Sequence, residues 1–475
     1  MNNNTSMHNL DQDQSNKLRY TYFVCITAAC IGLLFGLDIG VIAGALPDIQ
    51  KAFALSPKLE GLVVSILLGG AVVGAFLSRY LARRYGRRNS LLICVTIYTI
   101  AALCSGFAPN YEILVVARFF LGIALGIAAF IAPIYLAEVA PESLRGRMVS
   151  LYQVMINVGI VCAYVSDTFF AANAEWRWML GVIAVPSFIA GVCFLLLPRS
   201  PRWLVLQNRV REAKDVLMSM SPSKELVHRN LEEMKAMAKD NISSGLGVLK
   251  QVNFRRVLYL GLLLQMIQAY TGINVIVYYA PELYKAAGFA SPMAQMYCTI
   301  AVGVVNMIVP MITARFVDQW GRRRIFFIGL TVITIGLLME TVAQYAPKTY
   351  FFAMMGFIAS LIFIAGFAFS LGPVVWIICS EIFPLKSREV GMMFIVASNW
   401  FYTMIIGQLF PMVDSTFGLG PVFVFSTIIA IFGFFLIGCY TPETKGITLE
   451  EIEENLLSGK KLRHLGKQPN FNKQL

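Results

Sequence analysis

Long apolar runs separated by short polar segments make up most of this chain. A helix needs about 20 consecutive apolar residues to cross a bilayer, and runs of this kind recur along the whole sequence. The pattern predicts an all-α membrane protein with twelve transmembrane helices, at about 20–46, 60–80, 89–107, 111–138, 148–171, 175–197, 254–284, 292–316, 325–345, 350–382, 389–414 and 418–441.

Three polar segments divide the chain around these runs. Residues 1–19 are expected to be a polar tail without regular structure, and 442–475 a second tail that contains a short helix at 449–457. Residues 198–253 separate a first bundle of six helices (20–197) from a second (254–441), and their charge spacing predicts amphipathic helices at 209–218 and 224–239.

The two halves resemble each other in their loops. Residues 84–88 (RYGRR) match 319–323 (QWGRR), residues 137–141 (AEVAP) match 380–384 (SEIFP), and residues 198–202 (PRSPR) match 442–446 (PETKG), at an almost constant spacing. Such repeats predict two six-helix halves in the same orientation, related by an axis along the membrane normal. Transporters built in this way bind substrate near the midplane, between the halves.

The net charge of +12 reflects membrane topology rather than nucleic-acid binding. Of the 39 Lys and Arg residues, five fall on one side of the predicted membrane and one within a span, which leaves 33 on the other side. The positive-inside rule therefore places both termini in the cytoplasm. The nine cysteines form no C-x-x-C pair, and they indicate neither a metal site nor a disulfide framework.

Asp38 is a carboxylate in the middle of an apolar, glycine-rich span, FGLDIGVIAG. An ionisable residue at membrane depth is costly and usually functional. Arg118, in the fourth span, is the other deep charge of the first half, so the two are expected to pair. All three histidines lie outside the spans, so a proton carrier within the membrane has to be a carboxylate. A static ion pair that only holds helices together is the alternative.

Neutral polar residues gather in the second half. Amides donate and accept hydrogen bonds, which suits the adjacent hydroxyls of a sugar, and an aromatic ring suits its C–H face. The seventh span carries Gln265, Gln268 and Asn274, and Gly272 allows the helix to loosen beside them. Each amide alone could equally serve as packing between helices.

Several motifs together give the chain a specific resemblance. FGLDIGVIAGALP, PIYLAEVAPESLRGRMVS, SPRW, TGINVIVYYAP, VDQWGRR, GPVVWIICSEIFPLKSRE and PETKG occur in order between about Leu18 and Gly466. With them the chain resembles the sugar porter family of the major facilitator superfamily, and within it the bacterial galactose–proton and arabinose–proton symporters. The resemblance implies that the positions of Asp38 and Arg118 form the proton-coupling pair.

The same resemblance implies a sugar site between the halves. Its implied ligands are amides and one tryptophan, and its implied lining is mostly aromatic. The ligands are Gln153, Gln268, Asn274, Asn306, Trp376 and Asn399, and the lining residues are Phe35, Tyr278, Gly372 and Trp400. One position departs from the family, because Ala269 stands where a second consecutive glutamine is usual. The loss of a hydrogen bond is worth about 1 kcal/mol, so affinity or sugar preference is expected to differ.

Charged loop residues predict gates between helix ends. Tyr279 is expected to close the extracellular side. On the cytoplasmic side the expected pairs are Glu138 with Arg145, Glu381 with Arg388, and Asp318 with the cluster Arg322, Arg323 and Arg324. Arg83 and Arg199 stand where the family carries acidic residues, which predicts a weaker or rearranged gate in the first half. A role in topology alone is the alternative.

These observations predict a proton-coupled symporter that imports a neutral monosaccharide by alternating access. The expected location is the bacterial inner membrane, with the protein as a monomer, the proton as coupling ion and no other cofactor or metal. A passive facilitator, a drug–proton antiporter and a membrane sugar sensor are the rivals. Asp38 argues against the first, the neutral amides argue against the second, and the short tail after the last span argues against the third. No nucleotide loop or nucleophile–base pair supports an enzyme.

Overall fold

A computed structural model describes residues 2–141, 144–171, 175–220, 223–240, 246–347, 349–384 and 387–466. The side chains of residues 2–15, 224, 237–240, 246 and 318 lie outside the described part. Within these ranges the chain is helical and contains no strand. Its α-helices are α1 (Asn2–Ala29), α2 (Ile31–Phe53), α3 (Pro57–Arg84), α4 (Gly86–Gly106), α5 (Tyr111–Val139), α6 (Arg145–Ala171), α7 (Trp176–Gly181), α8 (Ala184–Leu196), α9 (Pro201–Leu206), α10 (Val210–Met220), α11 (Lys224–Asp240), α12 (Val252–Gln268), α13 (Asn274–Ala287), α14 (Pro292–Trp320), α15 (Arg322–Tyr345), α16 (Tyr350–Phe369), α17 (Leu371–Ile382), α18 (Arg388–Phe417), α19 (Gly420–Tyr440) and α20 (Leu449–Leu457).

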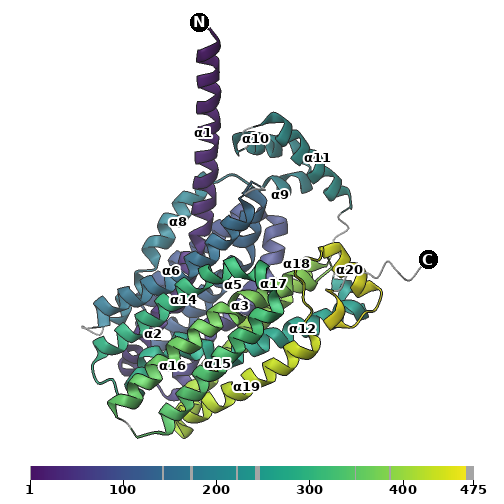
Figure 1. Cartoon of the computed structure of the whole chain (residues 1–475). Coiled ribbons are helices and arrows are strands. Elements are labelled where there is room, and N and C mark those ends of the chain that lie inside the picture. Colours follow the sequence, from purple (N-terminus) through teal and green to yellow (C-terminus); the bar gives the residue numbers. More distant parts are fainter. Residues whose placement is uncertain are drawn as a thin grey trace, which may run out of the picture.

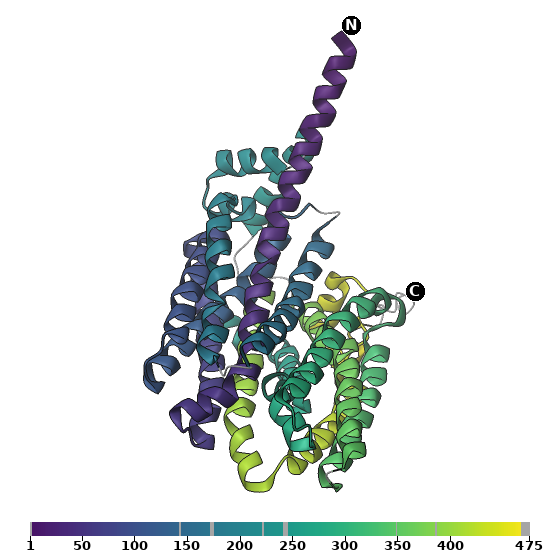
Figure 2. The ribbon, with the colours of Figure 1, turned by 90° about the vertical axis from the view of Figure 1, so that its left-hand side faces the viewer.

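In the described residues, twelve helical segments are long and apolar enough to cross a membrane, which confirms the predicted number. Most are single helices, such as α3 and α5. Four combine consecutive helices: α1 with α2, α7 with α8, α12 with α13, and α16 with α17. Figure 2 shows the purple and blue helices of the first half beside the green and yellow helices of the second.

Short helices gather at one end of the bundle. Figure 1 shows α9, α10 and α11 at the end from which α1 projects, and α20 near the other terminus. We call this end, with residues 198–253 and 442–466, the linker end, and the opposite end the far end. Helices α10, α11 and α20 lie close to the ranges that the charge spacing predicts.

The N-terminal segment differs from its prediction. Residues 2–19 were expected to lack regular structure, but they continue as part of α1, which runs unbroken to Ala29. The sequence contains neither glycine nor proline before Gly32. Once a helix is nucleated, each further residue adds a hydrogen bond, so the membrane-crossing part of α1 can propagate back along the chain. Figure 1 shows this helix standing clear of the bundle.

Close helix packing fixes the position of Asp38 on α2. A Cβ at Gly36 would collide with the carbonyl oxygen of Ile156, and a Cβ at Gly40 would lie 2.7 Å from the Cβ of Ala163. Small residues allow membrane helices to approach in this way. Helices α2 and α6 therefore pack tightly side by side, and the α2 side chains between these glycines point elsewhere.

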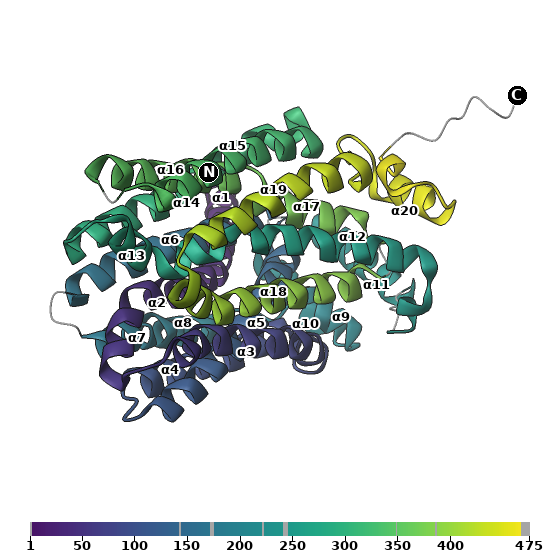
Figure 3. The same ribbon diagram turned by 90° about the horizontal axis from the view of Figure 1, so that it is seen from below.

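Helices α3 and α18 form a long contact where the two halves meet. They pack together along much of their lengths, and Figure 3 shows α18 beside the purple and blue helices of the first half. Helix α13 also packs against α2, and α14 against α6. Residues on these helices are therefore the ones that can join the halves or line a path between them.

Candidate transport site

The predicted ion pair forms at the centre of the first half. The Nη1 atom of Arg118 on α5 lies 3.3 Å from Oδ1 of Asp38 on α2, and the two side chains are 2% and 0% exposed. The Oδ2 atom of Asp38 and the Nε atom of Arg118 have no hydrogen-bond partner among the described residues. A buried carboxylate with one oxygen unsatisfied is suited to holding a proton, because a hydrogen bond to the charged form is missing there.

Two tyrosines lie within electrostatic range of this pair. Tyr98 on α4 interacts with both Asp38 and Arg118, and its buried hydroxyl has no partner among the described residues. Tyr278 on α13 interacts with both as well, although it belongs to the second half. Tyr278 is a residue of the predicted sugar site, so this interaction relates that site to the predicted proton pair. Tyr98 is not singled out by the sequence analysis. In the sequence, the one feature that marks this residue is a hydroxyl group within an apolar span.

The amides of the second half form one connected network. Nε2 of Gln268 donates to the carbonyl oxygens of Leu371 and Gly372, at 2.7 and 3.2 Å. Nδ2 of Asn399 donates to Oε1 of Gln265 at 2.8 Å and to Oε1 of Gln268 at 3.1 Å. The structure thus brings the predicted residues Gln268, Gly372 and Asn399 together, and adds Gln265. Gln265 is three residues before Gln268, and this spacing in the sequence places both side chains on the same face of the helix.

A break in the seventh span sits beside this network. Residues 269–273 form a π-helical turn between α12 and α13, in which Gly272 has a φ of 97°. Only glycine adopts this backbone conformation without strain. Ala269, at the start of the turn, is buried with 1% of its surface exposed. Asn274 follows the break and its Nδ2 donates to Oγ1 of Thr403 on α18 at 3.3 Å.

Contacts between the halves involve the remaining predicted sugar residues. The rings of Phe35 on α2 and Trp400 on α18 meet edge to face, with centroids 5.6 Å apart. Nδ2 of Asn306 on α14 lies 3.5 Å from Oδ1 of Asn157 on α6. Asn157 is four residues after Gln153, so the two lie on the same face of α6; Gln153 is exposed. Trp376 on α17 is half-buried and packs against the hydrophobic core; among the described residues it forms no hydrogen bond with the network.

Contacts toward the far end lie both within the second half and between the halves. The hydroxyl of Tyr279 donates to the carbonyl oxygen of Gly407 at 3.0 Å, and its ring packs on Phe410 with centroids 4.4 Å apart. Ser65 on α3 donates to Oε1 of Gln408 on α18 at 2.8 Å. Tyr279 thus packs α13 on α18 within the second half, whereas Ser65 and Gln408 join the two halves.

The acidic residues at the linker end pair differently from the prediction. Glu138 accepts from Arg87 at 2.9 Å and from the hydroxyl of Ser200 at 2.5 Å. The expected pair of Glu138 with Arg145 does not form, because Arg145 begins α6 as an exposed residue. Arg87 instead lies in the first turn of α4, beside the end of α5.

The second half repeats this arrangement. Glu381 accepts from Arg322 at 2.8 Å and from the hydroxyl of Thr444 at 2.5 Å. The expected Glu381–Arg388 ion pair does not form; Arg388 is half-buried and within electrostatic range of Glu381, Glu450 and Glu453. Arg322 and Arg87 begin matching helices, which explains why both halves use the same geometry. The Asp318 side chain lies outside the described residues.

Glu443 binds a helix N-terminus in the second half, and the matching position of the first half carries an arginine. Its carboxylate accepts from the backbone N–H groups of Arg322 and Arg323, at 3.0 Å each, at the start of α15. A carboxylate suits a helix N-terminus. Arg199 occupies the matching position in the first half and lies 3.7 Å from Glu212. Arg83 pairs instead with Glu389 of the second half at 3.0 Å.

Comparison with known proteins agrees with these features. The model of the family described as "Sugar (and other) transporter" matches residues 24–456. The galactose–proton symporter of Escherichia coli K12 is 41% identical over 460 residues, covering 96% of this chain and 98% of that protein. The arabinose–proton symporter of the same strain is also 41% identical over 460 residues, covering 94% and 96%.

Solved structures give the same result for the fold. The partially occluded inward-open form of the xylose transporter XylE from Escherichia coli has a TM-score of 0.79 and 28% identity, and the match covers 90% of this chain and 100% of that one. The proton:xylose symporter XylE bound to 6-bromo-6-deoxy-D-glucose has a TM-score of 0.77 and 28% identity, covering 92% and 99%. The chain therefore belongs to the sugar transporter family and has the fold of the major facilitator superfamily.

Proposed function

We propose that this protein is a symporter that couples inward proton flow to the uptake of a neutral monosaccharide. The observation that carries the proposal is the buried Asp38–Arg118 pair next to Tyr278. The proton site of the first half thereby lies within electrostatic range of a residue of the predicted sugar site in the second. The relatives named as galactose–proton and arabinose–proton symporters support the same assignment.

The contacts suggest an order of events. A proton on Asp38 removes its negative charge and weakens its attraction to Arg118. Tyr278 senses this change because it lies within range of both groups. Sugar hydroxyls then replace some of the hydrogen bonds that Gln268, Asn399 and their neighbours make with one another. An uncharged substrate fits this site, because the network consists of amides and carbonyl oxygens.

Alternating access then moves one half against the other around the bound sugar. The hydrogen bond from Ser65 to Gln408 joins the halves at the far end, and the contact of Tyr279 with Gly407 and Phe410 holds α13 against α18 within the second half. The ion pairs of Glu138 and Glu381 bind helix ends within each half, at the linker end. We infer that they hold each half rigid at that end while the halves separate. Glu389 joins the halves there through Arg79 and Arg83.

The linker end faces the cytoplasm in this proposal, since it carries most of the Lys and Arg residues. Both termini are then cytoplasmic, and the protein works as a monomer in the bacterial inner membrane. Sugar enters from the far end and leaves at the linker end, followed by the proton.

The experiment is uptake into liposomes that contain the purified protein, with an imposed pH gradient. A panel of galactose, arabinose, xylose and glucose identifies the substrate. We expect one or more of these sugars to accumulate above its outside concentration, and accumulation to collapse when a protonophore removes the gradient. Equal sugar concentrations at steady state with the gradient intact indicate a passive facilitator instead.

A further inference from the structure

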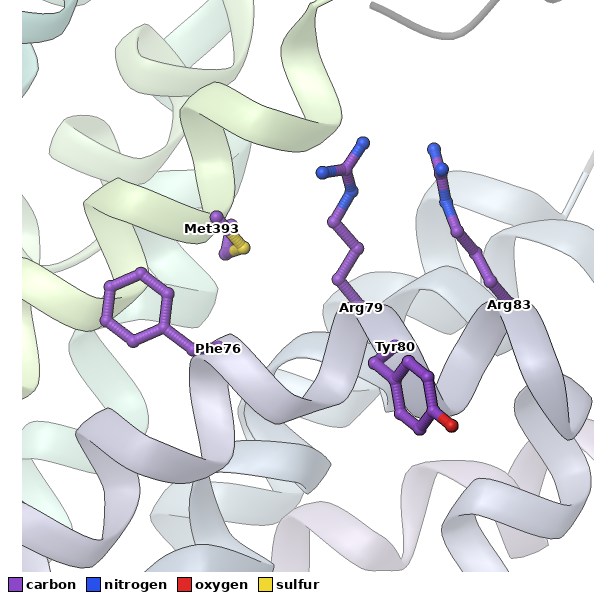
Figure 4. A pocket seen from close by; sticks show the side chains of 5 residues that line it. All are labelled: Phe76, Arg79, Tyr80, Arg83 and Met393. Atoms are coloured by element: carbon purple, nitrogen blue, oxygen red, sulfur yellow. The ribbon is translucent and has the colours of Figure 1, made fainter. Parts of the chain in front are cut away.

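A pocket of about 320 Å³ lies at the linker end, away from the transport site. Four of its lining residues, Phe76, Arg79, Tyr80 and Arg83, come from α3, and Met393 comes from α18. Figure 4 shows both guanidinium groups extending from α3 into the open space beside Met393. The α3 residues follow helical spacing, so they form one stripe along that helix.

This stripe borders the surface that faces the bilayer. Val73, Leu77 and Tyr80 are 46%, 38% and 55% exposed on the adjacent face of α3. Exposed apolar side chains on a membrane-crossing helix contact lipid tails. Phe76 is 43% exposed and packs edge to face on Phe394 of α18. The pocket therefore opens toward lipid, with Phe76 deeper in the membrane and Arg83 nearer its surface.

The pocket carries excess positive charge. Nε of Arg79 lies 3.5 Å from Oε1 of Glu389, and Nη2 of Arg83 lies 3.0 Å from Oε2 of the same carboxylate. Two guanidinium groups thus share one negative charge. Each guanidinium has five N–H donors, so one carboxylate cannot satisfy both. Arg83 is also 46% exposed, which leaves part of its donor surface accessible.

We propose that this pocket binds the phosphate group of an anionic phospholipid from the leaflet at the linker end. Arginine pairs bind phosphate with charge-assisted hydrogen bonds, and basic pockets between membrane helices are suited to lipid headgroups. Phe76, Tyr80 and Met393 provide the apolar wall for the start of the acyl chains. This site goes beyond sugar transport and does not depend on which substrate the protein carries.

Lipid binding competes with a contact between the halves. Glu389 lies on α18 of the second half, whereas both arginines lie on α3 of the first. A phosphate that takes over the guanidinium donors weakens this ion pair. Anionic lipid therefore loosens the linker end, and Glu389 lowers the affinity of the pocket for lipid.

Native mass spectrometry of the purified protein with equimolar phosphatidylglycerol and phosphatidylcholine tests the site. The double variant Arg79→Gln/Arg83→Gln is expected to lose preference for phosphatidylglycerol by about fivefold for each arginine. Arg84→Gln is the matched control, because it removes a charge from the same end of α3 but does not line the pocket. Glu389→Gln is expected to increase the retention of phosphatidylglycerol.

If the arginines bind lipid, the double arginine variant lowers the retention of phosphatidylglycerol and Glu389→Gln raises it. If the arginines act only through their ion pair with Glu389, removal of either partner has the same effect. An unchanged lipid preference in the double variant, or lower retention in Glu389→Gln, overturns the proposal. Displacement of phosphatidylglycerol by millimolar inorganic phosphate overturns it too, in favour of a soluble anion.

Discussion

Arg118 and Asp38 form an ion pair 3.3 Å long between α5 and α2, with both side chains excluded from solvent. Loss of one partner from such a pair leaves a buried charge that nothing compensates, at a cost of about 3–5 kcal/mol. We therefore predict that Asp38→Asn lowers the thermal stability of the detergent-solubilised protein, because Arg118 stays charged.

The double variant Asp38→Asn/Arg118→Gln is expected to recover much of that loss, because it removes both charges. The measurement is thermal unfolding of the wild type, both single variants and the double variant, treated as a double-mutant cycle. A loss of stability in the double variant that equals the sum of the losses in the two single variants contradicts a direct interaction between Asp38 and Arg118.

Gln268 links the amide network to the backbone of α17. Removal of its side chain deletes donors and acceptors that a sugar can use, each worth about 1 kcal/mol, or roughly fivefold in affinity. Gln268→Ala is therefore expected to raise the half-saturating sugar concentration by at least that factor, with little effect on folding. Gln207→Ala, at the linker end, is the control for a glutamine outside the site. Unchanged half-saturation in Gln268→Ala removes this residue from the sugar site.

Tyr279 joins α13 to α18 toward the far end, through its hydroxyl and its ring. Tyr279→Phe removes the hydrogen bond to Gly407 but keeps the contact with Phe410. The loss of about 1 kcal/mol is expected to loosen α18, whose Gln408 also bonds to Ser65 on α3, and so to favour opening at the far end. Hydrogen exchange over residues 57–65 and 407–417 is then faster than in the wild type, whereas residues 79–84 at the other end of α3 are unaffected. Faster exchange along all of α3 instead indicates general destabilisation.

Gly272 provides the break between α12 and α13. An alanine there adopts a φ of 97° only with strain of about 1–2 kcal/mol, and its Cβ lies 3.0 Å from Oγ of Ser426. Gly272→Ala is expected to slow transport and lower stability. Gly438→Ala is the matched control, because its nearest neighbour, in Phe327, is 3.8 Å from the added Cβ. Equal transport rates in the two variants contradict a role for the break.

The sequence predicts which charges lie deep in the bundle better than it predicts the contacts between side chains. Asp38 and Arg118 could be paired in advance, because few charges lie deep in the first half. The partners of Glu138 and Glu381 could not, because Arg87 and Arg322 are close to them only after the helices pack. The pairing of Asn399 with Gln265 depends in the same way on how α18 crosses α12.

The N-terminal helix differs from the sequence prediction for another reason. Polar composition alone suggested an irregular tail, but the absence of helix-breaking residues allows α1 to extend through it. The twelve spans were predictable because each needs a long apolar run.

Proton movement during sugar transport tests the central role of Asp38 most directly. Liposomes containing the protein, weakly buffered and without an imposed gradient, are given a transported sugar while the external pH is recorded. We predict that the wild type alkalinises the medium when sugar enters, and that Asp38→Asn gives no pH change although it still exchanges labelled sugar across the membrane. Sugar-dependent alkalinisation by Asp38→Asn at the wild-type rate contradicts the assignment of Asp38 as the proton site.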